Sequence, residues 1–597
     1  MYFIKILTIL FLFLPISASG NQKSDLNKSE NYNLNSGNKY LKFKKEGKPV
    51  ISDKWMVVTA NTQASEAAAK ILKKGGTAAD AMISAQLVLG LVEPESSGLG
   101  GGAFLVYFDN KTKKITTLDG RETAPLLINE NVFQDINGNS LKFFDAVVGG
   151  KSVGTPGTPA LLEMAYKKWG KTKWSLLFDD AINLSNNGFV ISNKLSSSIK
   201  KSRKSLSKFL KTKSYFLPNG MPLESGDIHF NKNYANTLKA FEKNRSEVFY
   251  NGYIANDIVS TVNNASHNPG VLSIKDMINY KVIERKPICS NYRGYQVCGM
   301  GPPSSGAITI AQILGMIENF DISKLGPKNP ETWRIIGDAS RLAFADRSIY
   351  IADSDFIDVP VKKLIDYNYL KERSKLLDRK IKLKKIKAGK LTSNLSIKWG
   401  PDNSIELPST SHISIVDQYG NALSMTTTIE NGFGSRLMTD SGFLLNNELT
   451  DFSFKSFKNG KKIANCIEPS KRPRSSMAPT IILKNNKPVY ILGSPGGSNI
   501  IGYVVNAIIS MIDWKKNAQE AASVAHGINK FGTYYLEKNT IMSKLLPSLE
   551  DMKYKVKLRN FSSGLNIIHI NNKLYGGSDH RRAVSYTHLT LPTILPV

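Results

Sequence analysis

The sequence contains little cysteine, no metal-binding spacing and no phosphate-binding loop. Its 597 residues include three cysteines, an odd number that excludes a dense disulfide framework. Cys289 and Cys298 flank a predicted hairpin, where a cross-strand disulfide and two unpaired core thiols both fit; Cys466 has no base beside it and is interpreted as structural. The glycine-rich stretch 96–109 leads into a strand without a following Gly-Lys-Ser/Thr, which indicates close backbone packing instead of a P-loop. We predict no metal and no cofactor.

Acidic residues are scarce relative to basic ones. Lys and Arg number 79 against 49 Asp and Glu, which gives a formal net charge of +30 and a pI near 9.6. Such a charge suggests nucleic-acid binding, but the lysines are spread along the chain without a DNA-binding motif. We therefore interpret them as a solvated basic surface and predict no nucleic-acid partner. A basic envelope-binding protein is kept as a rival hypothesis.

An apolar run lies within the first 20 residues. Residues 6–16 are apolar and are followed by small residues at 17–20, the pattern of a secretory signal peptide over 1–20. The run is about half of the roughly 20 residues that a membrane span needs. We expect no integral span in the mature form; an uncleaved anchor is the alternative. Residues 21–54 are polar and predicted to be flexible, and residues 583–597 break the preceding pattern and are interpreted as a non-native tail.

The remaining sequence is typical of a globular α/β protein, with 41% hydrophobic residues and 45 glycines. From Trp55 a short apolar strand and an Ala-rich helix are predicted, followed by a buried helix over 78–92 that Thr77 caps. Two alternating runs predict a β-hairpin over 412–429 that turns around Gly420 and Asn421. This order of elements predicts helices outside packed sheets.

Thr410 is the candidate nucleophile. It follows a Lys-rich connector, about 370–407, whose composition predicts an exposed segment. If the Ser409–Thr410 bond is cut, the new α-amino group, with a reference pKa of about 7.7–8.0, becomes a base on the residue that carries the hydroxyl. A cut shifted by one residue would offer Ser411 instead. His412 suggests a Ser/His arrangement, but the amine makes that base unnecessary and a structural role is expected.

Several motifs occur together and in order. Those before residue 410 are SSGLGGGAFLVY, LDGRETAP, VGTPGTPA, GPPSSG and FADRSIYIADSDF, and those after it are TSHISIVDQYGNAL, LLNNELTDF, KRPRSSMAPT and GSPGGS. In order and spacing they resemble motifs of gamma-glutamyltranspeptidases (glutathione hydrolases), members of the N-terminal-nucleophile hydrolase superfamily. The resemblance spans about 55–582. It implies an α/β (α+β) fold, a four-layer αββα sandwich, autoprocessed into a large subunit, 55–409, and a small subunit, 410–582.

The resemblance assigns a role to each matched residue. Cleavage at Ser409–Thr410 frees Thr410 as the nucleophile, and Thr428 orients it. The other positions bind the substrate or its transition state. The α-carboxylate would be bound by Arg121, Ser475 and Ser476, and the α-ammonium group by Glu430, Glu448 and Asp451. The oxyanion would be bound by Gly496 and Gly497. Together these groups would recognise both charges of an amino-acid head group.

The implied activity is that of a periplasmic or secreted heterodimer, made from one precursor, that acts on glutathione and other γ-glutamyl compounds. Water or an amino-acid or dipeptide acceptor would resolve the acyl-enzyme. The alternatives are a related acylase that takes glutaryl-cephalosporin or poly-γ-glutamate, and an inactive, unprocessed protein. The segment between Asp451 and Lys471 is shorter than the lid of many family members and contains no tyrosine, so a more open site with altered acceptor preference is expected.

Overall fold

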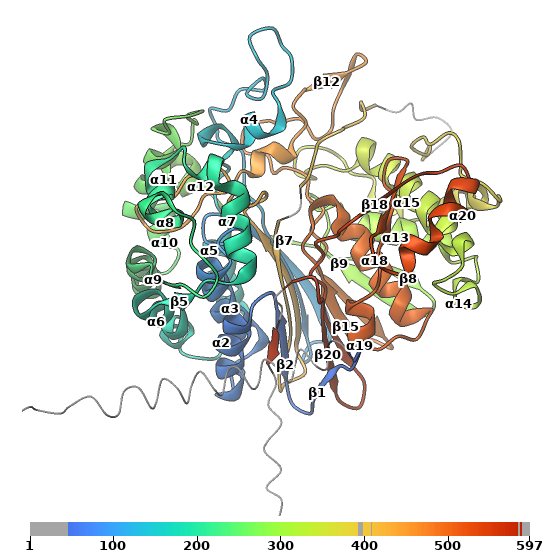
Figure 1. The fold of residues 1–597 in the computed structure, drawn as a ribbon, viewed down its shortest axis with the longest axis horizontal. Coiled ribbons are helices and arrows are strands. Elements are labelled where there is room, and N and C mark those ends of the chain that lie inside the picture. The colour runs from blue at the N-terminus through green and yellow to red at the C-terminus, as the bar shows by residue number, and fades with distance from the viewer. Residues whose placement is uncertain (1–43, 45, 392–397, 408, 583–584, 588–597) are drawn as a thin grey trace, which may run out of the picture.

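Two stacked seven-stranded sheets form the centre of the computed structural model, which describes residues 44, 46–391, 398–407, 409–582 and 585–587 (Figure 1). The first sheet has the order β21 (Ser585–Thr587), β2 (Met56–Thr59), β10 (Ser411–Val416), β11 (Ala422–Thr428), β3 (Gly102–Asp109), β4 (Lys114–Gly120) and β7 (Ile283–Arg285). The second has the order β1 (Val50–Ser52), β20 (Leu574–Ser578), β19 (Asn566–Ile570), β15 (Lys487–Gly493), β14 (Thr480–Lys484), β9 (Tyr295–Gly299) and β8 (Ile288–Tyr292). Buried side chains of both sheets pack against one another between the layers, among them Val58, Phe108, Ile481 and Ile491.

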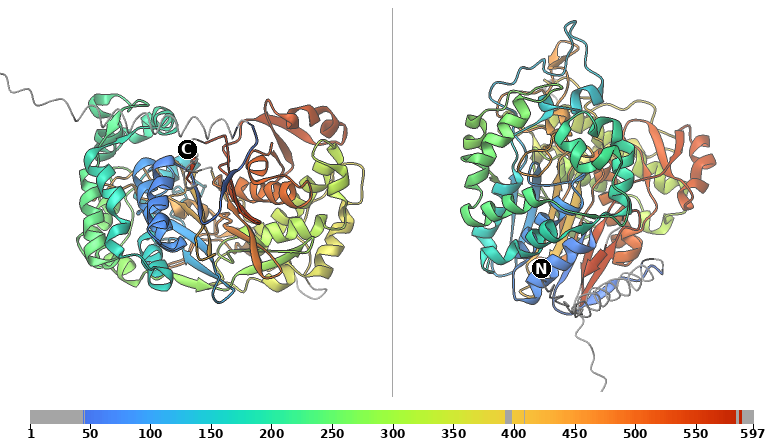
Figure 2. Two further views of the ribbon diagram at one scale, coloured as in Figure 1. Left: turned by 90° about the horizontal axis from the view of Figure 1, so that it is seen from below. Right: turned by 60° about the vertical axis from the view of Figure 1, so that its left-hand side comes forward.

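Helices cover the outer face of each sheet (Figures 1 and 2). On the first sheet lie α2 (Thr62–Lys73), α3 (Ala78–Val92) and α5 (Thr158–Trp169), and α3 contacts β10 and β11. The second sheet is covered by α13 (Gly306–Ile317) and α18 (Ile500–Ile512), with α15 (Pro330–Tyr350) packed on α13. Outside α3 lie α6 (Asp179–Asn187), α7 (Asn193–Leu206), α9 (Lys232–Asn244) and α11 (Tyr253–Asn263). The expected four-layer αββα order is confirmed.

Local sequence signals explain the elements nearest the site. The Thr77 side chain accepts a hydrogen bond from the Asp80 backbone N–H and the Asp80 carboxylate accepts one from Thr77, a capping box that starts α3. The predicted hairpin is confirmed, because β10 and β11 pair from Ser411–Thr427 to Val416–Ala422. Gly420 has a φ of +77° in its turn, a conformation that suits glycine. The hairpin places residues 410 and 428 together at one end of the first sheet.

The ends of the fold differ in part from expectation. The second sheet begins before Trp55, because Val50–Ser52 pairs with β20 and so removes these residues from the predicted flexible segment 21–54. Ser585–Thr587 pairs with β2 at the edge of the first sheet. The signal peptide predicted at 1–20 and most of the predicted tail at 583–597 lie outside the described residues, so both stay predictions.

Cys289 and Cys298 face each other on β8 and β9 and form a disulfide, which decides between the two alternatives. Cys466 is a buried free thiol. Within the described part of the chain, we find no helix that is both long and apolar enough to span a bilayer.

Candidate active site

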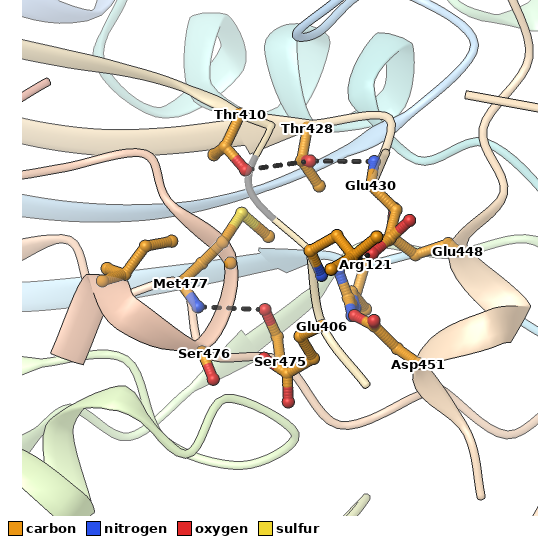
Figure 3. A pocket seen from close by; sticks show the side chains of 13 residues that line it. Arg121, Glu406, Thr410, Thr428, Glu430, Glu448, Asp451, Ser475, Ser476 and Met477 are labelled. Carbon is orange, nitrogen blue, oxygen red and sulfur yellow. Dashed lines mark hydrogen bonds and ion pairs between the residues drawn. The ribbon is translucent and has the colours of Figure 1, made fainter. Parts of the chain in front are cut away.

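Thr410 and Thr428 lie side by side at the mouth of the hairpin (Figure 3). Their hydroxyl oxygens are 3.2 Å apart, and the Thr428 oxygen also accepts a hydrogen bond from the Glu430 backbone N–H at 2.9 Å. β10 begins at Ser411, so Thr410 precedes the strand instead of opening it. Thr410 therefore lies next to the fixed hydroxyl group of Thr428, but Thr410 itself is not part of the β-ladder.

The bond between Ser409 and Thr410 is held in a strained and buried position. Thr410 has a φ of +121°, a region that β-branched residues rarely occupy. The Ser409 hydroxyl donates to the Glu95 carbonyl at 2.8 Å, and Arg582 Nη1 donates to the Thr410 carbonyl at 2.8 Å. Both residues are at most 5% exposed. Most described residues of the connector at about 370–407 are exposed or half-buried, as expected, but Ser409 and Thr410 beyond it are buried and make hydrogen bonds to the protein interior.

Arg121 lies directly after β4 and is fully buried. Its guanidinium pairs with Glu448 and with Asp451, and its Nη2 also donates to the Arg474 carbonyl at 3.1 Å. Its backbone N–H donates to Asp119, which fixes the turn that leaves the strand. The structure thus joins the predicted carboxylate-binding arginine to two of the acids predicted to bind the ammonium group.

Four carboxyl groups crowd this end of the site. Burial raises the pKa of Glu430, Glu448 and Asp451 well above ordinary carboxyl values, and repulsion from neighbouring carboxylates adds to the rise. Burial likewise raises the pKa of Glu122, a residue that sequence reasoning did not select, to about 7. One oxygen each of Glu448 and Asp451 has no hydrogen-bond partner among the described residues. A bound cation would relieve this repulsion and satisfy those oxygens.

The serine and glycine pairs complete the pocket. The Ser475 hydroxyl accepts from the Met477 N–H at 3.1 Å, and the Ser476 hydroxyl accepts from Arg347 Nη2 at 2.8 Å. Gly496 and Gly497 both have positive φ values, +140° and +56°. A Cβ on Gly497 would lie 2.6 Å from the carbonyl oxygen of Leu407, so only glycine allows this close approach.

Nine of the ten predicted catalytic and binding residues line one pocket, together with Glu406 and Leu407: Thr410, Thr428, Arg121, Glu430, Glu448, Asp451, Ser475, Ser476 and Gly497. The tenth, Gly496, adjoins Gly497. The remaining cavity has a volume of about 20 Å³, room for about one water molecule. Sequence reasoning missed Arg347 and Glu406. The FADRSIYIADSDF motif was a signal for Arg347, whereas no sequence signal marked Glu406.

His412 and the lid segment lie apart from the reacting atoms. The His412 ring bonds Thr426 and Ser414 at 2.8 and 3.1 Å between the sheets, and burial lowers its pKa to about 3. This agrees with a structural role.

After Asp451 the predicted short lid forms a small hairpin, in which Phe457–Lys458 pairs with Lys461–Lys462. The Phe454 ring stacks on the Phe133 ring, with their centroids 4.7 Å apart. Within the described residues, no group of three or more His, Cys, Asp or Glu side chains could hold a metal ion.

Comparisons with known proteins agree with this geometry. The sequence model of the Gamma-glutamyltranspeptidase family matches residues 64–588. The glutathione hydrolase proenzyme of Bacillus subtilis (strain 168) is 36% identical, over 88% of this chain and 90% of that protein. The glutathione hydrolase proenzyme of Escherichia coli (strain K12) is 34% identical, over 89% and 91% respectively. The crystal structure of cephalosporin acylase from Bacillus halodurans shares the fold, with a TM-score of 0.79 at 22% identity over 91% of this chain and 97% of that one. The chain therefore belongs to the gamma-glutamyltranspeptidase family.

Proposed function

We propose that this chain is the precursor of a gamma-glutamyltranspeptidase that hydrolyses glutathione and transfers its γ-glutamyl group, with Thr410 as the nucleophile. The observation that carries the proposal is one buried pocket in which a strained Thr410, paired with Thr428, faces Arg121 and a serine pair. Family membership supports the same activity.

The first step is self-cleavage of the Ser409–Thr410 bond. Thr410 Oγ1 attacks the Ser409 carbonyl carbon, the C–N bond breaks as the amide nitrogen takes up a proton, and an ester forms. Water then hydrolyses the ester, leaving a carboxylate on Ser409 and a free amine and hydroxyl on Thr410. The positive φ of Thr410 favours this step, because cutting the bond releases the residue from its strained conformation.

In the processed enzyme, the free amine of Thr410 takes the hydroxyl proton as the oxygen attacks the substrate's γ-carbonyl. The backbone N–H groups of Gly496 and Gly497 stabilise the tetrahedral oxyanion. The departing amine, Cys-Gly in the case of glutathione, receives the proton and leaves a γ-glutamyl ester. Water or an amino-acid amine resolves this ester and restores Thr410.

Substrate recognition divides between the two charges of the glutamyl head group. Arg121, Ser475 and Ser476 bind the α-carboxylate, so Arg121 exchanges its acidic partners for the substrate. Those partners, Glu448 and Asp451, together with Glu430, are then available for the α-ammonium group. A bound ammonium group would counter the burial and mutual repulsion that raise their pKa values, because a positive charge nearby favours the ionised carboxylates.

We further propose that the protein is exported by a signal peptide over 1–20 and works in the periplasm or outside the cell as a heterodimer of residues 55–409 and 410–582. The Cys289–Cys298 disulfide supports an oxidising compartment. Partition of the protein between cell fractions, with the N-terminal sequence of the large fragment, tests both points.

Purified protein tests the function. We expect two fragments on denaturing gels, the smaller beginning at Thr410, and hydrolysis of γ-glutamyl-p-nitroanilide and of glutathione. A higher kcat/KM for glutaryl-p-nitroanilide would favour the related acylase. A full-length band without activity would favour the inactive, unprocessed protein. Nucleic-acid binding that depends steeply on salt, without amidase activity, would favour the basic binding protein.

A further inference from the structure

In the uncut chain, a glutamate from the segment ahead of Thr410 lines the pocket. The carboxylate of Glu406, four residues ahead of Thr410, forms an ion pair with the guanidinium of Arg347, and both side chains are 4% exposed. Arg347 Nη2 also donates to the Ser476 hydroxyl at 2.8 Å. Figure 3 shows Glu406 beside Ser475 and Ser476, the pair proposed to bind the substrate's carboxylate. A carboxylate therefore already occupies this part of the site.

Leu407, the next residue, contacts the part of the site proposed to bind the α-ammonium group. The backbone N–H of Leu407 donates to Glu430 Oε1 at 3.3 Å. The uncut chain thus offers a carboxylate to Arg347 and an N–H group to Glu430. These are the two kinds of group, an anion and an N–H donor, that an amino-acid head group presents.

Arg347 is held ready for a carboxylate by the rest of its surroundings. Its Nε donates to the Ser305 hydroxyl at 2.7 Å, and its guanidinium lies over the Phe344 ring at 5.5 Å. Burial by itself would raise the pKa of Glu406, but Arg347 and Arg474 reverse the shift and hold it below the ordinary value. The pair is thus ionised, and a buried arginine that lost its partner would be left with a costly uncompensated charge.

We infer that Arg347 is a substrate carboxylate-binding residue of the processed enzyme, and that Glu406 occupies its place until the Ser409–Thr410 bond is cut. This inference rests on the proposed function. The cut puts Glu406 three residues from a new chain end, no longer bonded to the small fragment. The segment can then withdraw, and a carboxylate of the substrate takes over the ion pair. That carboxylate belongs either to the γ-glutamyl group or to the leaving peptide.

Kinetics of processed variants test the inference. In Arg347→Lys, which keeps the charge but loses the planar fork, we expect the KM for γ-glutamyl substrates to rise roughly 10- to 100-fold with little change in kcat. A rise for both γ-glutamyl-p-nitroanilide and glutathione assigns Arg347 to the α-carboxylate, whereas a rise for glutathione alone assigns it to the leaving peptide. The control is Arg341→Lys on the same helix, where Arg341 pairs with Asp338 and KM should not change. An unchanged KM for both substrates in processed Arg347→Lys would overturn the inference.

A binding measurement covers the case in which the Arg347 variant is not cut. In uncut Thr410→Ala protein, removal of the internal carboxylate by Glu406→Ala should allow added L-glutamate to raise the unfolding temperature. The same addition should have no effect when Arg347→Gln is also present. No stabilisation by L-glutamate in the Glu406→Ala protein would contradict an assignment of Arg347 to the γ-glutamyl group. No stabilisation by either L-glutamate or Cys-Gly would contradict the inference as a whole. Failure of the wild-type protein to hydrolyse γ-glutamyl substrates would instead refute the proposed function. The binding measurement does not require activity, so it would still test whether Arg347 binds a carboxylate.

Discussion

The hydroxyl oxygens of Thr410 and Thr428 lie 3.2 Å apart, although 18 positions separate the two residues. The antiparallel register of β10 and β11 brings them together, because Ser411 pairs with Thr427 and the next positions outward adjoin. The contact therefore depends on the hairpin turn at Gly420 and not on any local motif at either threonine.

Thr428→Val should lower the kcat for γ-glutamyl-p-nitroanilide roughly tenfold, the worth of one hydrogen bond that orients the nucleophile. KM should stay unchanged, since the proposed role of Thr428 is toward Thr410. Thr427→Val is the matched control: the neighbouring hydroxyl is buried and has no hydrogen-bond partner among the described residues. Equal losses in both variants would refute the proposed role of Thr428.

Thr410→Ala should remain one full-length chain, because it lacks the oxygen that attacks Ser409. Thr410→Ser should still be cut, since it keeps the hydroxyl. Electrophoresis with time and N-terminal sequencing of the small fragment measure both outcomes. A small fragment that begins at Ser411, or hydrolysis by Thr410→Ala, would show that another residue is the nucleophile.

Arg121→Lys should raise the KM for γ-glutamyl-p-nitroanilide roughly 10- to 100-fold, because lysine cannot form the two parallel hydrogen bonds that a guanidinium offers a carboxylate. The control is the substrate: 4-aminobutyryl-p-nitroanilide lacks the α-carboxylate, so wild type and variant should handle it alike. A similar loss with both anilides would instead indicate a general disturbance of the pocket.

Gly497→Ala should prevent cleavage or slow it strongly, because its Cβ would lie 2.6 Å from the Leu407 carbonyl oxygen, just ahead of the cut. Gly460→Ala is the control, with a similar φ of +72° and no neighbouring atom within 4 Å. It should cost only about 1 kcal/mol of backbone strain and leave cleavage intact. The cut fraction of freshly expressed protein measures the difference, and equal cleavage of the two variants would contradict the expected clash.

Glu122 should make stability depend on pH. Burial raises its pKa to about 7 in the folded protein, so between the ordinary carboxyl pKa of 4.5 and about 7 the folded state holds a proton that the unfolded state has lost. Stability contributed by this group is therefore complete below 4.5 and is lost as the pH rises through about 7. Glu122→Gln should flatten this decline, measured as unfolding temperature against pH in uncut Thr410→Ala protein. Parallel curves for the two proteins would show that Glu122 does not titrate in this range.

Much of the fold could be predicted because its signals are local. The Thr77–Asp80 capping box, the apolar run of 78–92 and the alternation around Gly420 each act over a few residues, and each formed the expected element. The site residues could be selected because their motifs stand in the family's order. The disulfide could not be decided, because only the pairing of β8 with β9 sets Cys289 opposite Cys298.

The sequence by itself, through motifs that resemble those of the family, determined the four-layer order and ten of the residues that meet around Thr410. The tertiary structure alone decided how they meet. It buried the Ser409–Thr410 bond, joined Arg121 to Glu448 and Asp451, and placed Glu406 against Arg347. The physical reason is desolvation: inside the pocket each charge must find a partner, and packing brings together partners that are far apart along the chain.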